Sequence, residues 1–420
     1  MYLIAIVMIV FLLLVLKLST KISIAPGQIN LLTIIIYRDF GVLTALALVF
    51  WINSPIRQTH YVIGQIPIPS LELAFYASFL FTFLILYYGF FMQFLFKKLA
   101  FRMPEVNFKS FSKIMKIWII ILLLVVIIMF FKNPPVVSQI FSGASAMDIS
   151  IARSEVGSNA IFKIVRNSWV PITSYTFLFI YIKDKKFRNW FILSVVLAII
   201  CSVWSGAKSS LASLLLGYLG VYILLSNVKI GNIKILMYAI LFICFIFLMY
   251  YLTNINSNND ISIIAQTAMY RFFGQAGGVG YAFYMYPNFF EFKYFTGISS
   301  FLSNMIGVEF SSVYGDLIDY AVPEFSDISG AMSSFAAGDA YGLFGWWGIL
   351  LGPLFVAFYY YLFYFMAAKG NAQILFIGMY GLYFGNAYLA SSFYSFVWPV
   401  GIAITIFPII VTYLICLVRK

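Results

Sequence analysis

Residues 117–131, IWIIILLLVVIIMFF, decide the fold of this chain. The stretch is apolar throughout and shows no alternation of polar and apolar positions, and residues 236–252, LMYAILFICFIFLMYYL, are nearly as apolar. Repeated apolar runs of about twenty residues cross a bilayer as α-helices, because lipid cannot satisfy an open backbone. A membrane barrel needs alternating segments of roughly ten residues instead. The sequence therefore predicts an all-α polytopic membrane protein.

The composition supports this class and excludes others. Hydrophobic residues make up 63% of the 420 positions and charged residues only 10%, whereas soluble domains carry about 25% charge. The net charge of +12 comes without an Arg-rich motif, zinc spacing or glycine phosphate loop, so we expect no nucleic-acid partner. Cys201, Cys244 and Cys416 each lie in an apolar block and form neither a metal set nor an evident disulfide framework.

The apolar blocks predict about eleven transmembrane helices, within a range of ten to twelve, in a single integral membrane domain of residues 1–420. The N-terminal run MYLIAIVMIVFLLLVL has no basic n-region or cleavage site, so we interpret it as the first helix and not as a signal peptide. The predicted helices lie near residues 1–17, 33–52, 71–96, 114–131, 167–182, 189–204, 209–226, 234–252, 341–366, 372–390 and 397–418.

Basic residues assign sides to the connecting segments. Alternate loops carry 17 and 8 Lys and Arg residues, with Arg38 inside a helix beside Asp39, where we expect a neutralising pair. Cytoplasmic loops are enriched in Lys and Arg, so the richer set, which includes the C-terminus, is predicted to be cytoplasmic. The N-terminus and the loops at 53–70, 132–168 and 253–340 are then external, and we expect the active site in the large 253–340 loop.

The external loop at 132–168 contains a cluster of charge, in AMDISIARSEVGSNAIFKIVRNSW. Arg153 and Glu155 are close in sequence, and Lys163 and Arg166 follow on one predicted helical face. One interpretation is a solvated surface helix with local ion pairs. The other is a cationic patch for an anionic headgroup, because guanidinium groups bind phosphate oxygens in pairs and stay charged.

Two further basic residues are candidates for an anion site. Lys208 follows Gly206 at a predicted helix start, where a helix N-terminus beside a cation favours anions; a snorkelling lysine with a serine cap is the alternative. Arg271 lies in an aromatic, then glycine-rich segment that does not match a phosphate loop. Its alternative role is an interfacial anchor.

Carboxylates in the large loop suggest a base more than a metal site. Asp316, Asp319, Glu324 and Asp327 do not have EF-hand spacing, so we interpret them as a solvated acidic stretch. Asp339 lies where the loop re-enters the membrane beside aromatics and glycines. Partial desolvation there would make it a usable base, and the alternative is an acid that complements a helix dipole.

Three short patterns together resemble the oligosaccharide repeat-unit polymerases, the Wzy class of bacterial O-antigen and capsule polymerases. SGAKSSLASLLLG is similar to the family's small-residue turn with a basic residue before a long helix, with Lys208 where Arg is frequent. MYRFFGQAGG is similar to the arginine segment that opens its large loop. GDAYGLFGWWGILLGPLF resembles the pattern that closes that loop, with Asp339 where Glu is common.

The resemblance implies a function and an architecture. Such polymerases transfer a growing glycan from undecaprenyl pyrophosphate to the non-reducing end of a lipid-linked repeat unit, on a scaffold related to the GT-C glycosyltransferases, without a cofactor or metal. Pyrophosphate would then meet fixed cations, and the candidates are Arg271, Lys208, Arg153 and Arg166. A sugar hydroxyl needs at most a general base, for which Asp339 is the first candidate and Glu155 the second.

Other functions stay open from the sequence alone. A lipid-linked oligosaccharide flippase would show repeats and charges along a central path, and we find neither. An O-antigen ligase resembles the polymerases but typically uses a histidine in the large loop, whereas the only histidine here is His60. A non-catalytic assembly component is the third alternative. The expected partners are the lipid-linked glycan, membrane lipids and a chain-length regulator, in a bacterial inner membrane.

Overall fold

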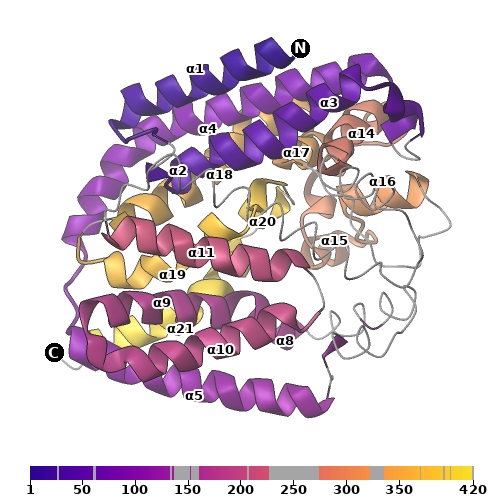
Figure 1. Cartoon of the computed structure of the whole chain (residues 1–420). Helices are drawn as coiled ribbons and strands as arrows, with labels where there is room; N and C mark the ends of the chain where they lie inside the picture. Colours follow the sequence, from indigo (N-terminus) through magenta and orange to yellow (C-terminus); the bar gives the residue numbers. More distant parts are fainter. Residues whose placement is uncertain are drawn as a thin grey trace, which may run out of the picture. The chain divides into compact units, whose positions relative to one another are not determined.

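The fold is helical wherever the structure describes it (Figure 1). The computed structural model describes residues 1–25, 28–59, 63–132, 135–136, 152, 160–205, 208–226, 274–321, 335–368, 370–390, 393–397 and 399–418. Within these ranges every regular element is an α-, 3₁₀- or π-helix. The all-α prediction is therefore confirmed for the described part of the chain.

Seven described helices are long and apolar enough to cross a membrane. They are α1 (Tyr2–Thr20), the continuous helix of α2, η2 and α3 (Leu31–Asn53), α4 (Ile68–Arg102), α5 (Phe108–Lys132), η6 with α10 (Lys185–Val203), α11 (Lys208–Ser226) and α18 (Trp346–Ala368). The molecule thus has the helices of a polytopic membrane protein.

Three other predicted spans are helical but fall short of that test. They are α9 (Val170–Lys183), α19 (Gln373–Gly385) and α21 (Pro399–Val418). The predicted span at 234–252 lies outside the described residues. A total of eleven therefore stays a prediction.

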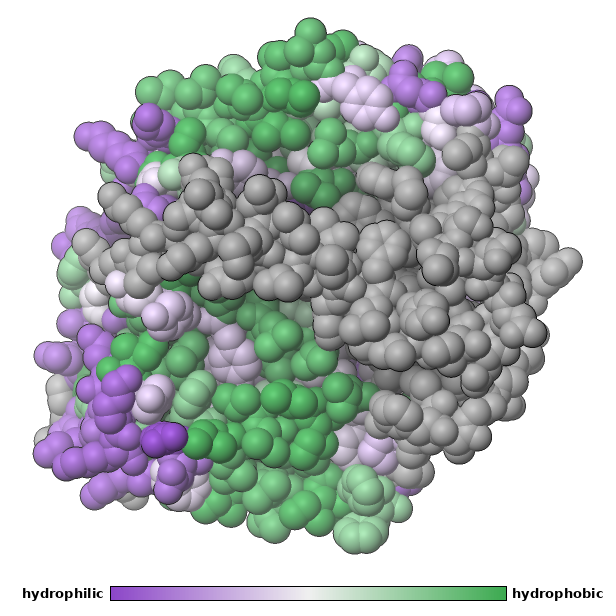
Figure 2. All heavy atoms as spheres, in the orientation of Figure 1, coloured by the Kyte–Doolittle hydropathy of each residue, from purple (hydrophilic) through white to green (hydrophobic). Residues whose placement is uncertain are grey.

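Side-chain exposure supports a lipid environment for the outer helices. On α5, Ile117, Leu124 and Phe131 are all largely exposed, and Phe131 is 81% exposed. Figure 2 shows apolar side chains covering the surfaces of such helices. Water-soluble proteins rarely expose a continuous apolar surface of this kind, whereas lipid tails solvate it.

The chain divides into two compact units. The first comprises Met1–Phe90, Val228–Phe358 and Ala387–Trp398, and the second comprises Phe91–Asn227, Tyr359–Asn386 and Pro399–Lys420. The first contains α1, the Leu31–Asn53 helix, the short helices of the large loop and the first half of α18. The second contains α5, α9, α10, α11, α19 and α21.

A π-helix in the first unit contains a buried ion pair. The Leu31–Asn53 helix starts at a capping box in which the Asn30 side chain accepts from the backbone amides of Leu32 and Thr33. It continues as a π-helix, η2 (Ile35–Leu46). There the Arg38 Nε donates to Asp39 Oδ1 at 2.6 Å, and Asp39 is fully buried. The predicted neutralising pair is confirmed.

Glycines set the packing of the second unit. Helices α11 and α19 approach so closely that a Cβ would not fit at Gly217, which faces the Gly381 carbonyl, or at Gly385, which faces the Ser213 carbonyl. Gly381 and Gly385 are spaced as in the small-residue motif that brings membrane helices together. Helix α9 packs on α10, α11 and α19 and completes this core.

Two predicted boundaries were wrong. The helix expected at 167–182 begins earlier: α8 (Ala160–Ile164) and the π-turn η5 (Val165–Trp169) continue into α9. The helix expected at 341–366 is two helices, α17 (Ala336–Phe344) and α18, and the 253–340 loop boundary falls inside α17. Apolar periodicity does not reveal the break between α17 and α18, because the backbone conformation of a single residue, Gly345, causes it.

Candidate functional site

The described part of the large loop folds into a layer of short helices. These are η8 (Gly274–Ala276), α14 (Gly277–Met285), η9 (Tyr294–Gly297), α15 (Ser300–Ile306), α16 (Val313–Ala321) and α17. Helix α14 packs against α16 and α17, and η9 packs against α15 and α17. The first part of the loop-closing motif, in α17, therefore packs against α14, α16 and η9.

Glycines in that motif shape the junction of α17 and α18. Gly345 has φ +59° and ψ −142°, a conformation that side-chain-bearing residues rarely adopt. Gly348, in the first turn of α18, faces the Ala340 carbonyl so closely that a Cβ would collide with backbone. Tyr341 stacks on Phe283 of α14, with ring centroids 4.1 Å apart. The spacing of the glycines and of Tyr341 in the motif thus fixes the position of α17 against α18 and α14.

Asp339 is held in the first turn of α17 and is 2% exposed. Its Oδ2 accepts a hydrogen bond of 2.6 Å from the Phe393 backbone amide, which precedes α20 (Tyr394–Val397). The structure is consistent with both interpretations from the sequence. An acid in the first helical turn complements the helix dipole, and a carboxylate this buried has lost most of its water, as a desolvated base would. The structure adds a third role, because the carboxylate anchors a separate segment.

A buried tyrosine that the sequence did not single out lies near this carboxylate. Tyr286 is fully buried, and within the described residues its hydroxyl has no hydrogen-bond partner. Burial raises its pKa above the ordinary value, and the negative charges of Asp316 and Asp339 raise it further. The hydroxyl therefore stays protonated. Only the tertiary fold places it there, so no sequence signal could have found it.

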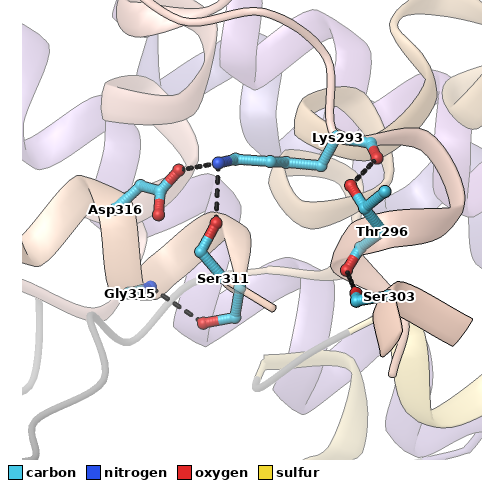
Figure 3. Close-up of polar contacts among 7 residues, drawn as sticks. Lys293, Thr296, Ser303, Ser311, Gly315 and Asp316 are labelled. Carbon is cyan, nitrogen blue, oxygen red and sulfur yellow. Dashed lines mark hydrogen bonds and ion pairs between the residues drawn. The ribbon is translucent and has the colours of Figure 1, made fainter. Parts of the chain in front are cut away.

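Asp316 is tied to a lysine and is not part of a solvated acidic stretch. Lys293 forms an ion pair with Asp316 and donates to Ser311 Oγ at 2.7 Å (Figure 3). The two side chains are 23% and 16% exposed. Lys293 is also fixed through its backbone amide, which donates to the Gly342 carbonyl of α17. The prediction was wrong for Asp316, because its partner lies on a different element.

The structure describes only part of the rest of that acidic stretch. Asp319 is exposed, as predicted, while Glu324 and Asp327 lie outside the described residues. Across the residues that the structure describes, no group of three or more His, Cys, Asp or Glu side chains is arranged to hold a metal ion.

Arg166, in the second unit, has a guanidinium nitrogen without a hydrogen-bond acceptor among the described residues. It lies in the π-turn η5, half-buried, with its guanidinium 5.8 Å from the centre of the Phe162 ring. Its Nε donates to Asn167 Oδ1 at 3.0 Å, but its buried Nη1 meets no acceptor in the described part of the chain. Lys163, one turn earlier, is exposed. The two residues are helical, as predicted, but only Arg166 is partly withdrawn from water.

Of the remaining predicted site residues, the structure describes only the backbone of Lys208. Helix α11 begins at Lys208, as predicted, although its side chain is not among those described. Arg153, Glu155 and Arg271 lie outside the described residues. Arg166 and Lys208 belong to the second unit and Asp339 to the first.

Comparison of the chain with protein-family models, with curated proteins and with solved structures finds no match. The resemblance to the repeat-unit polymerases stays a prediction, and the function is proposed below from the residues themselves.

Proposed function

We propose that this chain is a membrane glycosyltransferase that polymerises lipid-linked oligosaccharide repeat units. It transfers the growing glycan from undecaprenyl pyrophosphate to the non-reducing end of an incoming unit, at the outer face of a bacterial cytoplasmic membrane. Support comes from the apolar helices, which suit a lipid-borne substrate, and from the three polymerase-like patterns, two of which begin or join described helices.

The strongest support comes from Arg166. A buried guanidinium N–H without an acceptor costs about 1–3 kcal/mol, and such groups are rare unless a ligand or water satisfies them. A pyrophosphate oxygen is the acceptor that a guanidinium fork fits best. Because η5 is a π-turn, a feature frequent at functional sites, the backbone also aims this side chain differently from a regular helix. We therefore assign Arg166 to the leaving pyrophosphate, together with Lys208, Arg153 and Arg271.

The transfer step also needs a base that takes the proton of the acceptor hydroxyl. As the bond between the donor sugar and pyrophosphate breaks, the acceptor hydroxyl forms the new glycosidic bond and loses its proton, while the fixed cations stabilise the charge that develops on pyrophosphate. Asp339 is the candidate to take that proton, with Glu155 as the alternative. The hydrogen bond from Phe393 to Asp339 holds the carboxylate in one orientation.

Exposed aromatic rings in the loop layer supply a surface for the sugars. Phe289 and Tyr320 are each about half exposed, with ring centroids 6.2 Å apart. Flat aromatic faces pack against the apolar faces of sugar rings and orient them without charge. The acceptor glycan would lie across these rings on the first unit.

Purified full-length protein incubated with a lipid-linked repeat unit tests the function. A ladder of products that differ by one repeat unit on a gel is the expected result. If folded protein left the substrate unchanged, the chain would not be a polymerase. In a strain without the gene, single repeat units should still reach the outer face; their absence there would indicate a flippase.

A further inference from the structure

An open apolar groove lies on the second unit, lined by residues of α9, α10 and α11. Its volume is about 550 Å³. Val196 and Ile199 of α10 form one wall, and Leu215 and Leu219 of α11 form the other. A volume of this size suits one small molecule or a single lipid tail, since ligand sites measure roughly 300–1,000 Å³.

The few polar atoms near the groove are already satisfied. The Tyr218 hydroxyl is hydrogen-bonded to Ser174 Oγ. Ser174 Oγ also donates to Ser194 Oγ at 3.0 Å, and Ser194 Oγ donates to the Phe191 carbonyl at 2.7 Å. These hydrogen bonds occupy the hydroxyls of Tyr218, Ser174 and Ser194. The groove therefore presents only hydrocarbon to an occupant.

One end of the groove leads to a cluster of basic side chains. Phe191, which lines the groove, stacks on Tyr181 with ring centroids 5.2 Å apart and planes within 3°. The Lys185 ammonium lies 4.1 Å from the centre of the Tyr181 ring. The groove wall thus passes directly into the segment KDKKFR, residues 183–188, where the helices turn.

This segment holds more positive charge than it can neutralise itself. Its four basic side chains are all exposed, and they are Lys183, Lys185, Lys186 and Arg188. Its one acid, Asp184, caps the turn by accepting from the Lys186 amide at 3.0 Å. Lys116 of α5 adds another cation, 4.8 Å from the centre of the Phe187 ring. Figure 2 shows hydrophilic side chains gathered at one end of these helices, next to apolar surface.

We propose that this groove binds an anionic glycerophospholipid of the bilayer, with one acyl chain between α10 and α11 and the phosphate among the 183–188 cations. Charge complementarity selects the headgroup, because basic pockets between membrane helices bind acidic lipids. The apolar walls select the tail. The site does not depend on the proposed polymerase activity, and no assigned pyrophosphate cation is among the residues that line the groove.

Native mass spectrometry of the purified full-length protein, titrated with phosphatidylglycerol, phosphatidylcholine or undecaprenyl phosphate, tests the site. We expect phosphatidylglycerol to bind more tightly than the other two. Lys185→Gln and Lys186→Gln should each weaken it about fivefold, while Lys98→Gln, an exposed lysine on α4, should not. Val196→Trp should abolish binding by filling the groove, and Ile200→Trp, equally exposed on α10 but outside the groove, should leave it intact.

Three results would overturn the proposal. Equal affinity for phosphatidylglycerol and phosphatidylcholine would remove the role of charge. Unchanged binding in Val196→Trp, with a normal helical circular dichroism spectrum, would place the lipid elsewhere. Preference for undecaprenyl phosphate would make the groove a carrier site and not a site for a bilayer phospholipid.

Discussion

Arg166 and Lys293 are two cations that the sequence places alike, each in a segment between apolar blocks, yet they meet opposite surroundings. Lys293 is neutralised by Asp316 and hydrogen-bonded to Ser311. Arg166 donates to Asn167 and lies against the Phe162 ring, yet keeps a buried N–H without an acceptor in the described residues. Positive charge alone therefore does not identify an anion site. Unmet hydrogen-bonding capacity next to that charge does.

Replacing Arg166 gives the largest expected effect. Arg166→Ala should lower the rate of polymer formation about a thousandfold, because a fixed donor to the developing pyrophosphate charge is lost. Arg166→Lys should recover only part of it, since an ammonium cannot bind two oxygens in one plane. Ladder formation with purified protein measures both.

Lys163→Ala is the matched control for that change. It removes a positive charge one turn away on the same helix, from an exposed side chain, and should leave the ladder almost unchanged. A loss as large as that of Arg166→Ala would show that general positive charge matters, and the contrast with Lys293 would fail.

Asp339 separates a chemical role from an anchoring role. In Asp339→Asn the side-chain oxygen still accepts from the Phe393 amide but cannot take a proton, so we expect about a hundredfold lower turnover with normal thermal stability in detergent. Asp339→Ala should lose both activity and stability. Full activity in Asp339→Asn would leave Asp339 with the anchoring role alone.

The glycine junction should respond through stability. Gly348→Ala forces a Cβ against the Ala340 carbonyl, and relief of such overpacking costs about 1–3 kcal/mol. Thermal denaturation in detergent should therefore shift to lower temperature. Gly401→Ala, where a Cβ meets nothing within 4 Å, is the control. Equal stability of the two variants would contradict the close packing of α17 on α18.

Asp316→Asn has the smallest expected effect. It removes the carboxylate that neutralises Lys293, so that the Lys293 charge, like that of Arg166, is no longer neutralised by this acid. Because the pair is partly exposed, its loss should cost only about 1 kcal/mol of stability. The same thermal measurement applies. If the change instead destroyed folding, the pair would hold the loop layer together, and a freed Lys293 could not be compared with Arg166.

Local sequence patterns predicted the features that depend on neighbouring residues. The apolar runs predicted the helices, the Gly and Ser residues around Lys208 predicted the start of α11, and the adjacent Arg38 and Asp39 predicted their ion pair. Each of these depends on residues within a turn or two of one another. The acid in the first turn of α17 follows the same logic, although its partner Phe393 does not.

The rest of the site depends on contacts between distant segments. Lys293 meets Asp316 only because η9 and α16 pack around α17, and Tyr286 is buried there by the same packing. Arg166 is partly buried because Phe162 lies one turn before it in a helix that begins earlier than the apolar pattern suggests. Gly345 breaks α17 from α18 through its backbone conformation, which hydropathy does not record.

Binding of undecaprenyl pyrophosphate to the purified protein tests the central claim most directly, because it isolates the anion site from the chemistry. Charged hydrogen bonds contribute about 1.5–3 kcal/mol each, so the account predicts that Arg166→Ala binds the carrier roughly ten- to a hundredfold more weakly than wild type and Lys163→Ala. Equal affinity of all three proteins would contradict it.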